Sequence, residues 1–319
     1  MKQNNYLLNF LKVTFFALLL IATSPVRAEI KVVTTIKPLH SLIANVMDGV
    51  GEPSLIIEDS TSPHSFTLKP SHAKLLEEAD LIFWVCEGIE TFMERPLESI
   101  VKNAEVVEFM EVESIEKLKF REESIYGDHD DHDDHDDHDD HDDHAGHEGH
   151  NHGEFDAHIW LDPSNAKEMV HEIAHELGDL DPANKDKYEA NADATILALD
   201  QLIEDVSKDI NKDAKFVVFH DAYQYFEERF GVRAAGALTL NTDVLPGAKQ
   251  IDEIQDVIKD RGVNCIFSEP QFNPKIITTI AKDTNIKTGV FDPLGANINS
   301  DKDLYFKLIS NLGSELKGC

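Results

Sequence analysis

The sequence predicts an α/β protein with two lobes, each built on a mostly parallel four-stranded sheet flanked by helices, joined by one long helix. Three observations carry this prediction. Short β-branched runs alternate with helical patterns in the first half of the chain, and the same alternation recurs near the other end. An unbroken helical stretch lies between them. Alternating strands and helices indicate βαβ units and therefore parallel sheets.

The chain begins with the features of an export signal. Residues 1–28 combine lysines, an apolar stretch from Val13 to Ala22 and small residues before Glu29, which is typical of a secretory signal peptide cleaved after Ala28. The apolar stretch is too short to span a membrane, and no later stretch approaches the ~20 apolar residues of a spanning helix. No cysteine stands at the cleavage point to carry a lipid anchor. We therefore expect a mature chain that is not embedded in a membrane and is located in the periplasm.

The first lobe is predicted over residues 29–181. Its strands are expected within IKVVTTI, SLIIE, ADLIFWV and AEVVEF, with helices opening at Pro38 and Ser71 and near Phe92. Residues 128–152 are rich in aspartate and histidine and have no apolar face. Because like charges repel one another there, we expect this segment to be disordered without metal.

One long helix is predicted over residues 182–211, because this stretch has no glycine and its only proline is at the start. A helix of that length would run roughly 40 Å, which predicts a rigid connection between the lobes. The second lobe follows over residues 212–319. Its strands are expected within KFVVF, VRAAGAL, VNCIFS and KTGVF, with helices opening near Asp221, Pro246 and Pro274.

The charge balance excludes one class of partner and favours another. The 319 residues contain 61 acidic and 29 basic side chains, a formal net charge of −32. Nucleic acid, itself a polyanion, is not expected as a partner. A cation would be attracted by the field of the acidic side chains.

Four candidate metal ligands share one placement in the predicted elements. His64 lies in the loop after SLIIE, His220 follows KFVVF, Asp292 follows KTGVF, and His158 lies in the segment AHIWL. Ligands of open parallel sheets bind beyond the carboxyl ends of the strands, so these residues would meet in the cleft between the lobes. Three imidazoles with a carboxylate or water suit Zn²⁺, whereas Mg²⁺ and Ca²⁺ prefer oxygen ligands. The placement predicts a zinc site.

Motifs around these residues resemble the zinc-uptake periplasmic solute-binding proteins of ABC transporters, of the ZnuA type in metal-binding solute-binding protein family 9. The motifs are PHSFTLKPS, HIWLDPSNA, VFHDAYQYF, CIFSEPQF and FDPLG. The resemblance covers essentially the whole mature chain. It implies a protein without enzymatic activity that holds one Zn²⁺ in the cleft and delivers it to an inner-membrane ABC permease. It also implies His64, His158 and His220 as metal ligands, with Asp292 at the position of the family's aspartate.

Two positions at which members of the family differ bear on the choice of metal. Manganese-type relatives have a carboxylate where this chain has His220, so His220 favours zinc. The alternative is a manganese-type or broad divalent-metal binding protein of the same family. Pro63 occupies the place of a glutamate that approaches the metal in some members. The fourth ligand is therefore left open between Asp292, water and a residue of the segment 128–152.

Further residues are expected to support or supplement this site. His40 follows the first predicted strand and could reach the cleft as a supporting group or an alternate ligand, but a structural or hydrogen-bonding role is favoured. Glu269 follows VNCIFS at the same rim, where supporting the site by hydrogen bonding is the favoured role. The segment 128–152 is expected to bind additional divalent ions weakly. Its histidines are His129, His132, His135, His138, His141, His144, His147, His150 and His152.

The cysteines agree with export. Cys265 and the terminal Cys319 can pair in an oxidising compartment. A similar pair in zinc-type family members implies the same disulfide here. Cys86 ends an apolar run and is interpreted as a small buried residue without a function.

Residues 171–175, His-Glu-Ile-Ala-His, match the H-E-x-x-H motif of zinc peptidases, which is the alternative from another class. On a helical wheel Val170, Ile173 and Leu177 form an apolar stripe, and the two histidines share the other side with glutamates. This pattern indicates a solvated face, and no third histidine follows in ELGDLDP. A surface adhesin on the same fold is a third possibility, against which the missing lipid anchor argues. We expect a monomer.

Overall fold

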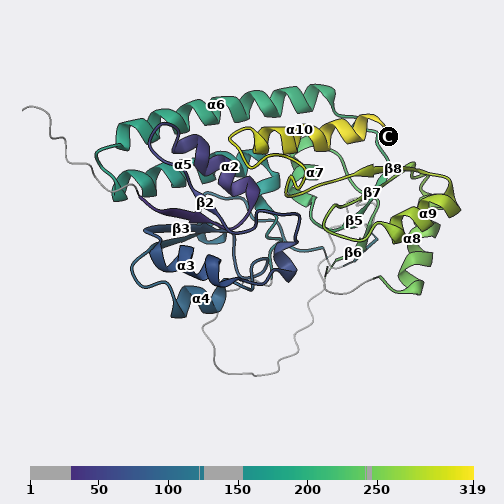
Figure 1. Ribbon diagram of the computed structural model, residues 1–319. Helices are drawn as coiled ribbons and strands as arrows, with labels where there is room; N and C mark the ends of the chain where they lie inside the picture. Colours follow the sequence, from purple (N-terminus) through teal and green to yellow (C-terminus); the bar gives the residue numbers. More distant parts are fainter. Residues whose placement is uncertain (1–29, 122, 126–153, 241, 243–245) are drawn as a thin grey trace, which may run out of the picture. The chain divides into compact units, whose positions relative to one another are not determined.

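Two parallel sheets organise the chain in a computed structural model, which describes residues 30–121, 123–125, 154–240, 242 and 246–319 (Figure 1). Each sheet has four strands, in the orders β2-β1-β3-β4 and β6-β5-β7-β8, and these described strands pair with one another in parallel. The predicted fold class is thereby confirmed. The predicted signal peptide and the segment 128–152 lie outside the described residues.

The first sheet consists of short strands, each within one of the predicted runs. The central strand β3 is buried along its whole length, as expected for a parallel sheet covered on both faces. Bounds of the strands are β1 (Val32–Thr34), β2 (Ser54–Leu55), β3 (Leu81–Trp84) and β4 (Glu105–Glu108), and bounds of the helices are α2 (Lys37–Val46), α3 (Pro70–Glu78) and α4 (Glu94–Ser99), with short 3₁₀ turns η1 (Pro63–Ser65) and η2 (Phe109–Glu111).

The second sheet repeats this construction. Helices α8 and α9 pack apolar side chains against β5, β6 and β7, whereas β8 forms an edge with several exposed residues. Bounds of the strands are β5 (Phe216–His220), β6 (Ala237–Thr239), β7 (Cys265–Ser268) and β8 (Lys287–Val290), and bounds of the helices are α7 (Gln224–Phe230), α8 (Ala248–Asp260), α9 (Lys275–Thr284) and α10 (Leu304–Lys317).

The strand β6 begins late in its predicted run, and another segment of the chain lies beside its start. Ile125 and Gly236 form an antiparallel bridge, and Ala237 donates its backbone N–H to the Ser124 carbonyl at 2.8 Å. A Cβ at Gly236 would lie 2.7 Å from the Ser124 oxygen, so only glycine permits this approach. A segment that follows the first sheet in the chain therefore contacts the edge of the second sheet.

The long helix α6 (Lys185–Asp209) packs against helices from both ends of the chain. Its buried positions repeat at alternating spacings of four and three residues, which places them on one face. That face contacts α2, α10 and α5 (Pro163–Leu180). Figure 1 shows α6 running along these three helices. The residue boundaries predicted for the two lobes stay a prediction.

The segment after β8 returns to the first half of the chain. Lys37 in α2 donates through Nζ to the carbonyls of Gly295, Ala296 and Ile298 at 3.1 to 3.3 Å. Trp160 donates through Nε1 to the Pro293 carbonyl at 2.8 Å. These bonds join residues more than 130 positions apart in the sequence, so the two halves share a polar contact as well as α6.

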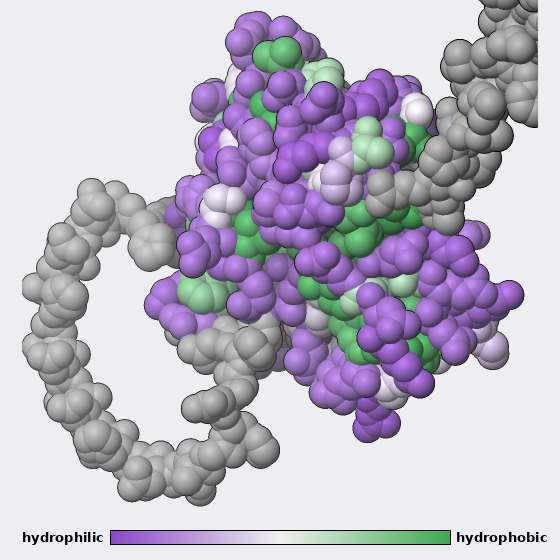
Figure 2. All heavy atoms as spheres, turned by 90° about the vertical axis from the view of Figure 1, so that its left-hand side faces the viewer, coloured by the Kyte–Doolittle hydropathy of each residue, from purple (hydrophilic) through white to green (hydrophobic). Residues whose placement is uncertain are grey.

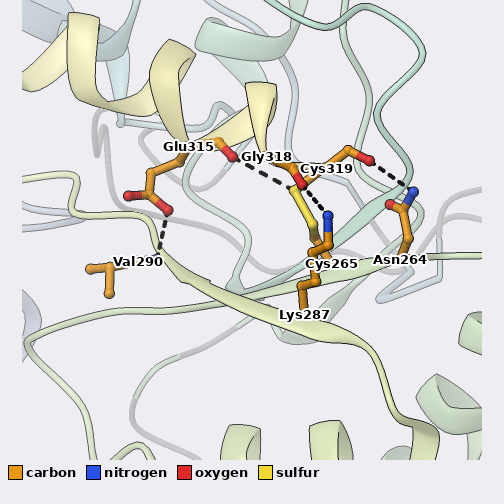
Figure 3. Close-up of a disulfide and its surroundings, with 7 residues drawn as sticks. All are labelled: Asn264, Cys265, Lys287, Val290, Glu315, Gly318 and Cys319. Carbon is orange, nitrogen blue, oxygen red and sulfur yellow. Dashed lines mark hydrogen bonds between the residues drawn. A yellow bond between two sulfur atoms is a disulfide. The ribbon is translucent and has the colours of Figure 1, made fainter.

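A disulfide fixes the C-terminus to the second sheet. Cys265 at the start of β7 is bonded to Cys319, which follows α10 (Figure 3). Asn264 donates through Nδ2 to the Cys319 carbonyl at 2.9 Å, and Lys287 donates through Nζ to the Gly318 carbonyl at 2.7 Å. The third cysteine, Cys86, is free and buried, and burial raises the pKa of its thiol to about 12.

On the face in Figure 2, hydrophilic residues cover most of the described surface, and hydrophobic residues show as small areas near its middle. Among the described residues, no helix has the length and apolar character needed to cross a membrane.

Candidate metal centre

Three histidines from separate elements converge on one point. His64 lies in the turn η1 after β2, His158 directly precedes the turn η3 (Ile159–Leu161), and His220 is the last residue of β5. One ligand nitrogen from each lies within 4.8 Å of the other two. Within the described part of the chain, this is the only group of three or more histidine, cysteine or acidic side chains so arranged.

The local structure explains how each histidine is presented. His220 ends a buried strand, at the edge where parallel sheets bind ligands. The turn that carries His64 begins at Pro63, and the backbone of the preceding residue, Ser62, is extended. His158 and His220 are almost completely buried, at 5% and 4% exposure, whereas His64 is only partly buried.

Glu269 accepts hydrogen bonds from His220 on the Nδ1 side of the ring. It follows β7, the strand next to β5, and its carboxylate accepts from His220 Nδ1 at 2.8 and 2.9 Å. The same carboxylate accepts from the His220 backbone N–H at 3.2 Å. Because Nδ1 donates to the carboxylate, Nε2 carries the lone pair and points away from Glu269. Hydrogen bonding was the role favoured for Glu269 from the sequence.

Asp156 does the same for His158, and sequence reasoning missed it. Its Oδ1 atom is 2.7 Å from His158 Nδ1 and 3.0 Å from the His158 backbone nitrogen. Asp156 is 1% exposed, and burial raises the pKa of its carboxyl to about 7. The signal available in the sequence was an aspartate two residues before a candidate histidine.

The Nε2 atoms of His158 and His220 face each other. Nε2 of His158 lies 3.2 Å from Nε2 of His220. Burial lowers the pKa of His64 and of His158 well below the ordinary value, with further lowering by neighbouring histidines. Burial also lowers the pKa of His220, but the charge and hydrogen bond of Glu269 outweigh it, and that pKa is raised. The two Nε2 atoms are at hydrogen-bond distance, so a metal ion that binds both would take the place of a proton between them.

Asp292 lies outside this group. Its carboxylate accepts from Gln271 Nε2 at 3.0 Å and caps the turn that follows it. The three backbone donors to this carboxylate are Leu294, Gly295 and Ala296, at 2.6 to 3.2 Å. Among the described residues Asp292 does not belong to the group of three histidines, and its predicted role as a ligand stays a prediction.

His40 and the peptidase-like motif also lie apart from the three histidines. His40 bonds through Nε2 to the Pro53 carbonyl at 3.1 Å, and burial lowers its pKa. His171 and His175 are exposed on α5. In the described ranges, neither belongs to a group of three metal-ligating side chains.

The helix α7 ties the surroundings of His158 to those of His220. Glu227 accepts from the Arg121 guanidinium at 2.7 Å, and the same guanidinium donates to Asp221, next to His220, at 2.8 Å. Arg229 forms a two-pronged pair with Asp162 at 2.6 and 2.7 Å. Arg121 and Asp162 both precede α6 in the chain. Their ion pairs join that part of the chain to α7 and to the end of β5.

Comparisons with known proteins show which family the chain is similar to. A family model described as the zinc-uptake complex component A, periplasmic, matches residues 32–319. The high-affinity zinc uptake system protein of Brucella abortus (strain 2308) is 48% identical over 303 residues, covering 90% of this chain and 91% of that protein. The protein of the same name in Yersinia pestis is 34% identical over 314 residues, covering 97% and 98%. A crystal structure of a ZnuA protein superposes with a TM-score of 0.72 at 21% identity, covering 91% and 98%, and shows the shared fold.

Proposed function

Because the chain belongs to the ZnuA family of periplasmic zinc-uptake components, we propose that it captures Zn²⁺ between His64, His158 and His220 and delivers it to an ABC permease. The observation that carries this proposal is the convergence of three ligand nitrogens within 4.8 Å of one another. Zn²⁺ is the cargo in this scheme, so the chain needs no catalytic group. We propose that it is not an enzyme.

The charges around the site suit a divalent cation. Three neutral imidazoles bring no charge, but Asp156 and Glu269 stand directly behind two of them and are 1% and 3% exposed. When both of these carboxyl groups are ionised, their two negative charges match the two positive charges of the ion. Each carboxylate also fixes the tautomer that leaves Nε2 free to bind.

Nitrogen ligands set the preference among metals. Imidazole suits zinc, whereas manganese and magnesium favour carboxylate and water oxygens. A manganese-type or broad divalent-metal protein of the same family is the alternative. It would need an oxygen ligand, for which Asp292 is the candidate, although its carboxylate lies outside the group of three histidines and now accepts from backbone N–H groups. Water is the simplest fourth ligand.

The remaining parts of the proposal concern place and partners. The signal-like residues 1–28 support export to the periplasm. The zinc-uptake family supports an inner-membrane ABC permease as the partner that receives the ion. We propose that the chain acts as a monomer, since zinc binding uses ligands from one chain only.

The direct test is anomalous diffraction at the zinc edge on zinc-loaded protein. The expected result is a single strong peak bonded to the three histidines, and a peak elsewhere with none there would overturn the proposal. In parallel, His158→Ala and His220→Ala should each weaken zinc binding by more than about 100-fold, since orienting partners alone contribute 10- to 100-fold.

The matched control is His171→Ala with His175→Ala, which removes two histidines from α5 instead. Retention of the tight ion in this control would also exclude the peptidase alternative. In a bacterium lacking its own copy of the gene, the unchanged chain should restore growth under zinc limitation and His158→Ala should not. Equal restoration by both would contradict a role in zinc import.

A further inference from the structure

The proposed zinc-uptake role does not use the exposed pair of histidines on α5. His171 and His175 are four residues apart on one helix, and both line a hollow of about 200 Å³ between α5 and α6. Side chains at this spacing lie one above the other on a helix, with Cβ atoms about 6 Å apart. Two imidazoles in this relation can bind one metal ion together.

The charges around the hollow favour a cation. From α6, Glu189 and Asp193 line the same hollow as the two histidines. Asp179, one turn further along α5, has its Oδ2 atom 3.9 Å from His175 Nε2. One cation, Lys185, also lines the hollow, and its Nζ atom lies 3.4 Å from Asp179 Oδ1. Three carboxylates against one ammonium leave a net negative charge beside the imidazoles.

The sequence motif alone suggested a peptidase, but the geometry supports a different chemistry. A catalytic zinc site has three protein ligands. In the part of the chain that the structure describes, no acidic or histidine side chain completes such a group with this pair. The exposed pair can supply two ligands, and water can supply the others.

We propose that His171 and His175 form a second metal site, which chelates a divalent transition-metal ion at the surface independently of the three-histidine centre. The site takes ions that accept imidazole nitrogen, with Cu²⁺ bound more tightly than Zn²⁺. It is weaker than the three-histidine centre, because it has fewer protein ligands and is open to water. The adjacent carboxylates hold the ion by charge rather than as ligands.

The test must locate the ion, because the three-histidine centre and the histidines of residues 128–152 are also proposed to bind metal. We suggest modifying the zinc-loaded full chain with diethyl pyrocarbonate and measuring the reaction of each histidine by peptide mass spectrometry. A metal buffer sets the free Zn²⁺ or Cu²⁺ concentration, so uptake by other histidines does not change it. His72, a single histidine on α3, serves as the internal reference.

The expected result is that His171 and His175 become protected together, at a lower free metal concentration than His72, and at a lower concentration of Cu²⁺ than of Zn²⁺. His175→Ala should move the protection of His171 to about tenfold higher metal concentration or more, because the second ligand no longer binds within the same molecule. Protection of the pair only where His72 is also protected would overturn the proposal.

A matched variant separates spacing from histidine number. Glu172→His combined with His175→Ala keeps two histidines but places them on adjacent positions, whose side chains do not face each other on a helix. This variant should behave like His175→Ala. If it binds as tightly as the unchanged chain, the four-residue spacing is not the cause and the proposal fails. Circular dichroism of each variant checks that α5 is retained.

Discussion

Nε2 of His158 and Nε2 of His220 lie 3.2 Å apart, although the two residues come from opposite halves of the chain and are 62 positions apart. Each ring has a buried carboxylate behind it, Asp156 or Glu269, that accepts from Nδ1. Both lone pairs are therefore directed at the same point. This relationship is the basis of the predictions on metal binding below.

Removing either supporting carboxylate should weaken zinc binding while the ligands stay in place. Glu269→Gln and Asp156→Asn keep the side-chain shape but remove the charge and the fixed tautomer. Loss of such partners typically costs about 10- to 100-fold in metal affinity. Competition titration against a chelating dye measures the change. Glu315→Gln is the control, because that exposed glutamate bonds the backbone of β8 away from the site, and an equal loss there would contradict the assignment.

Zinc affinity should fall as the pH is lowered, because Zn²⁺ and the proton compete for the same Nε2 atoms. The pKa of His220 is raised above 6.5, so binding near neutral pH displaces a proton from this ring. The pKa values of His64 and His158 are lowered well below 6.5, so these rings are already neutral there.

Affinity should therefore rise with pH up to the raised pKa of His220 and level off above it. The fall should steepen under acid conditions, where His64 and His158 also take up protons. Calorimetry in buffers of different ionisation enthalpy measures the protons released. About one proton per zinc or fewer is expected near pH 7, and release of about three would contradict these pKa directions.

The ion pairs of Arg121 should contribute strongly to stability. Its guanidinium, 15% exposed, bonds Asp221 and Glu227, which are 6% and 2% exposed. Arg121→Gln would leave two buried carboxylates without their cation and should lower the free energy of unfolding by roughly 3 kcal/mol. Urea denaturation of the zinc-free protein measures this loss.

The control is Lys119→Gln in the same segment, where the ion pair with Glu154 is solvent-exposed. Exposed pairs contribute little, so this variant should unfold at the same urea concentration as the unchanged protein. Similar losses in both variants would show that the segment, and not the buried ion pairs, determines the effect.

Deletion of residues 128–152 should leave the tight zinc site intact. The residues on either side of the segment are joined directly: Asp156 donates its N–H to the Leu118 carbonyl at 2.8 Å, and Phe120 donates to Glu154 at 3.1 Å. The position of His158 therefore does not depend on the deleted residues. Equilibrium dialysis should show one tight ion retained and fewer weakly bound ions. Loss of the tight ion would assign a ligand to the segment.

The disulfide should stabilise the second sheet without affecting the metal. Cys265 and Cys319 are 54 positions apart, and closing such a loop contributes about 4 kcal/mol in the chain-entropy model. Cys319→Ser should lower the melting temperature in oxidising buffer, with zinc affinity changed by less than about threefold. Cys86→Ala is the control, because it keeps the disulfide and a reductant should still lower its melting temperature. If a reductant does not lower the melting temperature of the unchanged protein, the prediction is wrong.

Much of the fold followed from the sequence because strands and helices are encoded locally. All eight strands lie in or overlap the predicted runs, and the helix α6 lies within the predicted stretch 182–211. The placement of His64 and His220 after strands also followed from local pattern, since parallel strands present their carboxyl ends at one edge. Sequence motifs further identified the family that the comparisons establish.

Other features depend on contacts between residues far apart in the chain, and no local pattern encodes them. The pairing of Arg121 with Asp221 spans 100 positions, and the contact of Lys37 with the turn after β8 spans about 260. The sequence by itself determined which residue types stand at the strand ends. Only the tertiary structure decided that Asp156 and Glu269 face the histidines and that Asp292 faces its own turn, because side-chain direction is set by packing between separate elements.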